Sequence, residues 1–133
     1  MKVLIADDEF NNRMLLQKLM SQHNASSDMV VDGQEAVDAF VMAHADGEPY
    51  NLILMDIMMP EMDGHKAVSA IRTKEKELGI HPSGEVKIIM VTALDSPKDV
   101  IKAYYRDGAT DYMVKPVNHG TLTDKLKNLG LLS

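Results

Sequence analysis

The stretch "LILMDIMMPEMDG", from Leu52 to Gly64, decides how this chain folds. It opens with four consecutive apolar residues, as a strand buried on both faces of a sheet does. The run then meets a carboxylate at Asp56. An aspartate there could close a turn through hydrogen bonds of its side chain, or it could serve a site at the end of the strand. The rest of the sequence distinguishes these two interpretations.

Similar apolar runs recur along the chain and alternate with longer stretches whose apolar residues lie three or four positions apart. The five predicted strands are 2–6, 29–31, 52–55, 86–91 and 112–114. Each intervening stretch is long enough for a helix that crosses over to a parallel neighbour. The pattern therefore predicts five βα units that form an α/β fold, an open parallel sheet with helices on both faces.

Local patterns add smaller predictions. The apolar face of the first helix is expected to contain Phe10, Met14, Leu16, Leu19 and Met20. That of the fourth helix is expected to contain Val100, Ile101 and Tyr104. The "DG" pair at 32–33 predicts a surface loop, and "KEKE" at 74–77 predicts the solvated end of a helix.

Composition is typical of one soluble domain that spans residues 1–133. Apolar residues make up 45% and charged residues 26% of the chain, and no apolar run reaches membrane-spanning length. Acids follow the short apolar start at once, which argues against a secretory signal. We therefore expect a cytoplasmic protein without membrane insertion.

Charge and residue usage exclude several kinds of site. The net charge of -6 disfavours direct binding to nucleic acid phosphates. The absence of cysteine excludes disulfides and thiolate metal sites. The five histidines lack the spacing that places two imidazoles on one metal, so each is expected to be a surface or packing residue.

Polar side chains follow the predicted strands at the edge where open parallel sheets bind ligands. Asp7 and Asp8 follow the first strand, Asp56 the third, Thr92 the fourth and Lys115 the fifth. If the first and third strands are neighbours, carboxylates about 5 Å apart repel by roughly 3 kcal/mol at an effective dielectric of about 20. Magnesium, which takes carboxylate oxygens and keeps several waters, would offset that repulsion. Capping of a nearby helix could explain Asp7 or Asp8 taken alone. The combination of these acids with polar residues at the ends of the other strands favours a functional site.

The chemistry of this set is that of phosphoryl transfer rather than nucleotide binding. Neither "GxGxxG" nor "GxxxxGK[ST]" occurs in the chain. A metal site, a carboxylate nucleophile, a hydroxyl and an ammonium are the groups needed to accept a phosphoryl group. Asp56 would attack phosphorus, and Thr92 and Lys115 would contact phosphoryl oxygens.

With these residues the chain resembles the receiver domain of two-component response regulators over essentially its whole length. The segments that carry the resemblance are "LIADDE", "LILMDIMMPEMDG", "IIMVTA" and "GATDYMVKPV". The resemblance implies a flavodoxin-like sheet with strand order 2-1-3-4-5. It also implies a cis bond between Lys115 and Pro116.

The resemblance assigns roles to individual residues. It implies Asp56 as phosphoacceptor, with Thr92 and Lys115 contacting the phosphoryl group. It implies a metal site for Mg²⁺, in which Mn²⁺ could substitute, formed by Asp7, Asp8, Asp56 and the backbone carbonyl of Met58. Asp8 is expected to be the principal ligand of the first strand, with Asp7 acting partly through water.

Three positions concern conformation and the lifetime of the phosphoryl group. Tyr112 matches the family's rotameric switch, and its alternative role is packing in the strand. Met58 and Leu94 occupy positions that influence self-dephosphorylation, and apolar side chains there predict a long-lived phosphoryl group. A Met58→Asn, Leu94→Glu double variant is expected to lose phosphate faster.

The resemblance implies a signalling switch rather than an enzyme with a separate substrate. A histidine kinase or histidine phosphotransfer protein would supply the phosphoryl group. We expect no output domain, because only four residues follow Leu129. The output would then be binding of a downstream target to the face of the fourth helix, fifth strand and fifth helix. The alternative is a phosphorelay intermediate that passes the group to a histidine on another protein.

Overall fold

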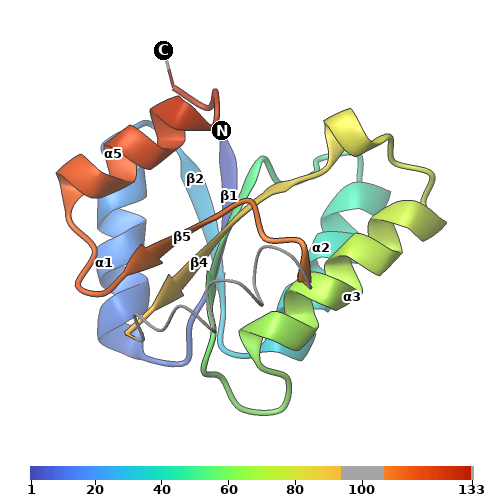
Figure 1. The fold of residues 1–133 in the computed structure, drawn as a ribbon, viewed down its shortest axis with the longest axis horizontal. Helices are drawn as coiled ribbons and strands as arrows, with labels where there is room; N and C mark the ends of the chain where they lie inside the picture. Colours follow the sequence, from blue (N-terminus) through green and yellow to red (C-terminus); the bar gives the residue numbers. More distant parts are fainter. Residues whose placement is uncertain (94–106, 133) are drawn as a thin grey trace.

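The computed structural model describes residues 1–93 and 107–132 as a parallel sheet between two layers of helices (Figure 1). The strand order is β2-β1-β3-β4-β5, and every neighbouring pair is parallel. The strands are β1 (Lys2–Ala6), β2 (Ser26–Val30), β3 (Leu52–Asp56), β4 (Lys87–Thr92) and β5 (Asp111–Val114). The predicted flavodoxin-like fold is therefore confirmed.

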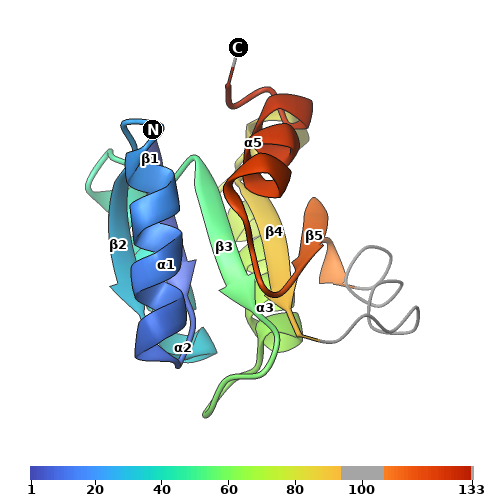
Figure 2. The same cartoon turned by 90° about the vertical axis from the view of Figure 1, so that its left-hand side faces the viewer.

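The described helices lie on both faces of the sheet. They are α1 (Phe10–Ser21), α2 (Gly33–Ala45), α3 (Gly64–Glu77) and α5 (His119–Asn128), together with a 3₁₀ turn, η1 (Pro82–Gly84). Helices α1 and α5 cover one face, and α2 and α3 cover the other (Figures 1 and 2). The apolar residues predicted for a fourth helix, Val100, Ile101 and Tyr104, lie outside the described residues.

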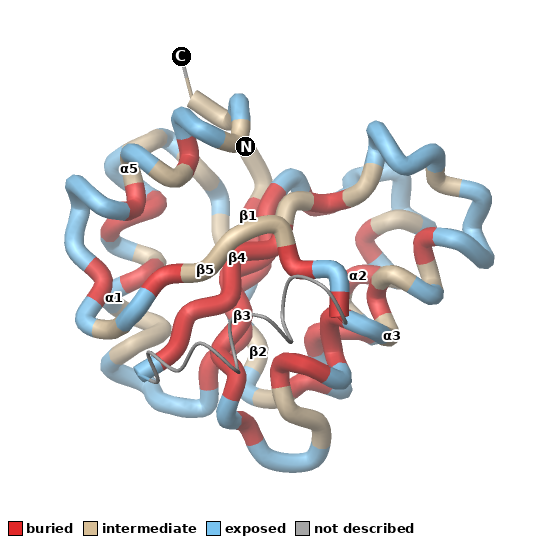
Figure 3. Tube along the Cα trace, in the orientation of Figure 1, coloured by how far each residue is buried: buried red, intermediate tan, exposed pale blue. Residues whose placement is uncertain are grey.

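Burial on both faces explains the continuous apolar runs of the central strands (Figure 3). All five residues of β3 are buried. Ile53 and Met55 pack into the core under α2 and α3, whereas Leu52 and Leu54 pack into the core under α1 and α5. This alternation holds Asp56 rigidly at the end of a strand whose preceding residues are fully enclosed.

The second strand begins three residues earlier than predicted. It pairs with β1 from Ser26 onward, and the backbone N–H of Ser26 donates to the carbonyl of Met1. The strand lies at the edge of the sheet, and its polar start is partly exposed. Backbone pairing therefore continues through residues that carry no apolar signal.

Two local predictions were wrong, those for Phe10 and for the "DG" pair, and the prediction for "KEKE" was right only in part. Phe10 does not face the core but is 63% exposed, with the guanidinium of Arg13 over its ring. The "DG" pair at 32–33 is not a surface loop, because Asp32 caps α2 and Gly33 is buried. The "KEKE" run does end α3, and Lys76 and Glu77 are exposed, but Glu75 is only 1% exposed.

The buried carboxylate of Glu75 connects α3 to the start of β4. It accepts hydrogen bonds from the backbone N–H of Val86 at 2.8 Å and from the guanidinium of Arg72 at 2.7 Å. Arg72 also donates to the carbonyl of Gly108 at 2.9 Å, ahead of β5. Charge pairing and hydrogen bonding thus satisfy a carboxylate that would otherwise be costly to bury. Within the described residues, no helix has both the length and the apolar character that a membrane span requires.

Candidate functional site

The strand ends bring the predicted polar side chains to one edge of the sheet. Asp56 and Thr92 are the last residues of β3 and β4. Asp7 follows β1 directly, and Lys115 follows β5 directly. Because all these strands are parallel, their carboxyl ends meet at the edge opposite the chain termini (Figure 1).

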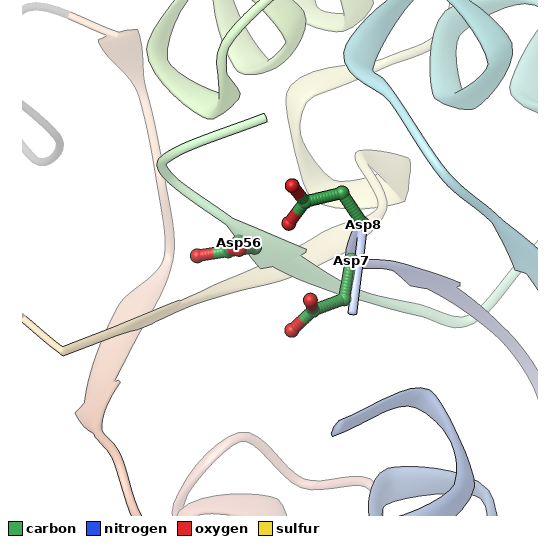
Figure 4. Close-up of side chains that lie close together, drawn as sticks. All are labelled: Asp7, Asp8 and Asp56. Carbon is green, nitrogen blue, oxygen red and sulfur yellow. The ribbon is translucent and has the colours of Figure 1, made fainter. Parts of the chain in front are cut away.

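Three carboxylates form the centre of this site (Figure 4). Oxygen atoms of Asp7, Asp8 and Asp56 all lie within 4.8 Å of one another. Asp7 is fully buried and Asp56 is 6% exposed, whereas Asp8 is exposed. The predicted meeting of acids from the first and third strands is therefore present.

Lys115 partly offsets the repulsion among these acids. Its Nζ lies 3.1 Å from Oδ2 of Asp7, to which it donates a hydrogen bond, and 3.5 Å from Oδ2 of Asp56. Burial alone would lower the pKa of Lys115, but the hydrogen bond with Asp7 and the charges of both acids raise it overall. The side chain is therefore a cation, but a single cation cannot neutralise three carboxylates.

The surroundings of Asp56 raise the pKa of its side chain. Burial raises its pKa from 3.8 to about 6, against the opposing charge of Lys115. The charge of Asp7 raises the pKa further, and a hydrogen bond from the backbone N–H of Met58 lowers it. A strand-end carboxylate in these surroundings matches a functional group better than a turn residue.

Asp7 has a structural role as well. Its Oδ1 accepts a hydrogen bond from the backbone N–H of Glu9 at 2.9 Å, and its carbonyl accepts one from Arg13 at 2.9 Å. Glu9 is the N-cap of α1 but makes no capping hydrogen bond with its own side chain. Asp7 therefore fixes the start of α1 and also lies within the acidic cluster.

The loop after Asp56 is held by the start of α3, a contribution that sequence reasoning missed. Asp63 caps α3 by accepting a hydrogen bond from the backbone N–H of Lys66, and the N–H of Gly64 donates to the carbonyl of Ile57 at 2.8 Å. A Cβ atom on Gly64 would lie only 2.3 Å from the carbonyl oxygen of Asp56. The available signal was Asp63 before a helical run, which is typical of an N-cap.

An open pocket of about 660 Å³ is lined by two of the three acids, Asp8 and Asp56, whereas Asp7 is buried behind them. Its walls combine the polar groups Asp56, Thr92 and Lys115 with apolar residues of the strand-end loops. Thr92 is 2% exposed, whereas the side chain of Met58 is 66% exposed at the pocket. The remaining lining residues are Glu9, Ile57, Met59, Pro60, Asp63 and Ala93.

The remaining predictions concern Tyr112, Leu94 and the peptide bond after Lys115. Tyr112 is half-buried on β5 and packs against the core under α2 and α3, outside the pocket lining. Leu94 lies outside the described residues. The bond between Lys115 and Pro116 is cis, as the resemblance implied.

The donor set fits a hard divalent cation. All three candidate side chains offer carboxylate oxygens, which Mg²⁺ prefers over nitrogen or sulfur ligands. Asp8 is exposed beside two buried acids, so a metal that keeps several waters could be held at the solvent side of the cluster. The residues present therefore fit Mg²⁺.

Comparison with known proteins assigns the family. The family model described as the response regulator receiver domain matches residues 3–127. This chain belongs to that family. A two-component response regulator of Arabidopsis thaliana, number 24, is 35% identical to this receiver domain over 95% of the chain and 81% of the relative. The chain spans only 47% of the length of the probable transcriptional regulator ycf27 of Cyanophora paradoxa. It spans only 6% of the length of the hybrid signal transduction histidine kinase I of Dictyostelium discoideum.

Solved structures agree with this assignment. The CheX-CheY-BeF3-Mg complex of Borrelia burgdorferi has a TM-score of 0.84 and 25% identity, covering 97% of this chain and 88% of that one. A co-crystal structure of the Saccharomyces cerevisiae histidine phosphotransfer protein Ypd1 with the receiver domain of Ssk1 has a TM-score of 0.83 and 33% identity. It covers 98% of this receiver domain and 88% of the matched chain.

Proposed function

We propose that this receiver domain is a phosphorylation-controlled signalling switch. Asp56 accepts a phosphoryl group from a phosphohistidine on a kinase or phosphotransfer protein, and the phosphorylated form changes its binding to a downstream protein. The observation that carries this proposal is the convergence of Asp56 with two further acids, a hydroxyl and an ammonium at the carboxyl end of the sheet. All of these residues except the buried Asp7 line one open pocket.

The transfer step needs an ionised nucleophile. With a pKa of about 6, Asp56 is mostly a carboxylate at neutral pH. One of its oxygens attacks phosphorus, so an O–P bond forms while the P–N bond to the donor imidazole breaks, and the ring nitrogen keeps the electron pair. Thr92 donates a hydrogen bond to one phosphoryl oxygen and Lys115 pairs with another, which stabilises the charge that develops there.

The metal site of this proposal consists of Asp7, Asp8, Asp56 and the backbone carbonyl of Met58. Mg²⁺ held by these groups would neutralise charge on the phosphoryl oxygens, and Mn²⁺ could take its place. The fit of the three carboxylates to a hard cation supports this assignment. The similar Borrelia protein, whose complex contains BeF3 and Mg, gives independent support.

The similarity to the complex of Ypd1 and Ssk1 supports a histidine-bearing partner. A histidine kinase would serve through the same chemistry. In the alternative role, a phosphorelay intermediate, Asp56 would return the group to a histidine of a second protein. Both roles begin with phosphorylation of Asp56.

The output surface of this proposal is the face of the fourth helix, β5 and α5. Phosphorylation draws Thr92 toward the phosphoryl group and lets Tyr112 turn inward, which alters that face. In the described part of the face, Lys125 of α5 lies 3.0 Å from the carboxylate of Asp111 and 5.3 Å from the ring centre of Tyr112. A movement of Tyr112 would therefore disturb a contact between β5 and α5.

Amide spectra of the protein with and without Mg²⁺ and beryllofluoride test the switch, because beryllofluoride on the carboxylate mimics a phosphoryl group. We expect shifts at Asp56 and Thr92 and along 96–129, and no shifts along 96–129 in Asp56→Asn. Identical wild-type spectra along 96–129 in the two states would contradict the proposed output face.

A further inference from the structure

Methionine is frequent in this chain, and its eleven members differ widely in exposure. All eleven lie in the described part of the structure. Two of these residues are more than half exposed, Met58 at 66% and Met42 at 65%. Because oxidation of methionine follows exposure, these two thioethers are the sites at which a hydroperoxide would react first.

The two exposed methionines differ in what surrounds them. Met58 lies two residues after Asp56, donates its backbone N–H to that carboxylate, and lines the same pocket as Thr92 and Lys115. Met42 lies on α2 and is absent from the lining of this pocket. The chain thus contains an equally exposed internal control for a thioether at the mouth of the site.

We propose that Met58 is a redox modification site, and that its oxidation to the sulfoxide by a hydroperoxide shortens the lifetime of the phosphoryl group on Asp56. This inference rests on the proposed phosphorylation of Asp56. A sulfur lone pair attacks one peroxide oxygen, the S–O bond forms and the O–O bond breaks. Sulfur is oxidised by two electrons, and the peroxide is reduced to water or an alcohol after its leaving oxygen takes a proton. A sulfoxide reductase restores the thioether.

The physical reason is the change in polarity at the pocket mouth. A thioether is a weak hydrogen-bond acceptor, whereas a sulfoxide is polar and its oxygen accepts strongly. Hydrolysis of an aspartyl phosphate needs a water in line with the O–P bond, and an acceptor at Met58 can orient that water. A positioned general base typically accelerates such a reaction by about 10²–10⁴-fold. A sulfoxide orients water but takes no proton at neutral pH, so we expect a smaller acceleration of roughly 3- to 10-fold.

The test compares the wild type with Met58→Leu and Met42→Leu. Each protein is treated with hydrogen peroxide or left untreated, freed of peroxide, phosphorylated with acetyl phosphate and Mg²⁺, and followed for loss of phosphate. Peptide mass mapping gives the oxidised fraction at each methionine, and amide spectra report the fold. We expect faster loss after peroxide in the wild type and in Met42→Leu, no change between the two forms of Met58→Leu, and reversal by a methionine sulfoxide reductase.

Two results would overturn the inference. One is an unchanged rate in wild type whose Met58 is mapped as oxidised; the other is an equal acceleration in Met58→Leu. Either result leaves phosphorylation of Asp56 intact, so the proposed function survives. An untreated wild type that takes no phosphoryl group on Asp56 would instead overturn the proposed function together with this inference.

Discussion

At the scale of single residues, Asp56 combines burial with charge. Its side chain is enclosed by the strand end and the following loop, with Lys115 at 3.5 Å and Asp7 nearby. Burial raises its pKa to about 6, and Lys115 only partly counteracts this effect. The residue is therefore ionised at neutral pH but at a cost to the free energy of folding.

The first prediction concerns that cost in the metal-free protein. Because the folded pKa exceeds the unfolded value of 3.8, Asp56 favours the folded state most below about pH 4, and this contribution is lost as pH rises to about 6. Asp56→Asn removes this pH dependence. The difference in unfolding free energy between the variant and wild type should therefore grow by about 1–3 kcal/mol from pH 4 to pH 7 in favour of the variant. Urea unfolding at both pH values measures it, and a constant difference would contradict the assigned pKa.

Gly64 gives the second prediction. A Cβ atom there would meet the carbonyl oxygen of Asp56 at 2.3 Å, so Gly64→Ala must displace the backbone next to the phosphoacceptor. We expect a loss of about 1–3 kcal/mol of stability, as in overpacked sites, and slower phosphorylation by acetyl phosphate. Gly120→Ala on α5 is the matched control, because its Cβ would meet nothing closer than 3.5 Å. Equal phosphorylation rates in wild type and Gly64→Ala would contradict this role.

At the scale of elements, the buried Glu75 joins α3 to β4, and through Arg72 to the chain before β5. Glu75→Ala leaves the buried N–H of Val86 and the guanidinium of Arg72 without this acceptor. We expect a loss of about 2–4 kcal/mol, measured by urea unfolding. Glu75→Gln, which keeps an acceptor, should lose less.

Glu77 provides the control for this third prediction. It lies in the same helix and pairs with Lys74 at 3.4 Å, but its side chain is 58% exposed. Glu77→Ala should change stability by no more than about 0.5 kcal/mol. Similar losses in Glu75→Ala and Glu77→Ala would show that burial of Glu75 does not stabilise the connection.

The elements also explain which features could be predicted from the sequence. Strands β1, β3 and β4 are buried on both faces, so they appear as continuous apolar runs, and the residues after them necessarily meet at one edge. The start of β2 could not be predicted, because an edge strand pairs through its backbone and tolerates polar side chains. The burial of Glu75 and the close approach of Gly64 depend on partners distant in sequence. The strand-end positions and the resemblance both predict Asp7 and Asp8 as metal ligands, whereas the contact of Asp7 with the start of α1 became apparent only from the structure.

At the scale of the whole molecule, the sheet concentrates negative charge at one edge, and a cation there should stabilise the fold. Mg²⁺ at about one hundred times its dissociation constant would add about 2.7 kcal/mol of stability.

Asp8 is exposed, whereas Asp7 is engaged by Lys115 and by the backbone N–H of Glu9. The fourth prediction is that Asp8→Ala weakens Mg²⁺ binding more than Asp7→Ala does. Relative to the wild type, we expect Asp8→Ala to raise the dissociation constant by at least roughly 10–100-fold, the loss that removal of an outer-shell partner causes. Calorimetric titration measures both, and equal affinities in the wild type and both variants would remove the proposed metal site.

Every proposal made for this receiver domain depends on phosphorylation of Asp56. The most direct test is incubation with acetyl phosphate and Mg²⁺, after which the intact mass gives the number of phosphoryl groups. Treatment with hydroxylamine then traps the acyl phosphate, and peptide mapping locates the modified residue. We predict one phosphoryl group per chain, located on Asp56, dependent on Mg²⁺ and absent from Asp56→Asn. A phosphoryl group on a serine or histidine, or undiminished labelling of folded Asp56→Asn, would contradict it.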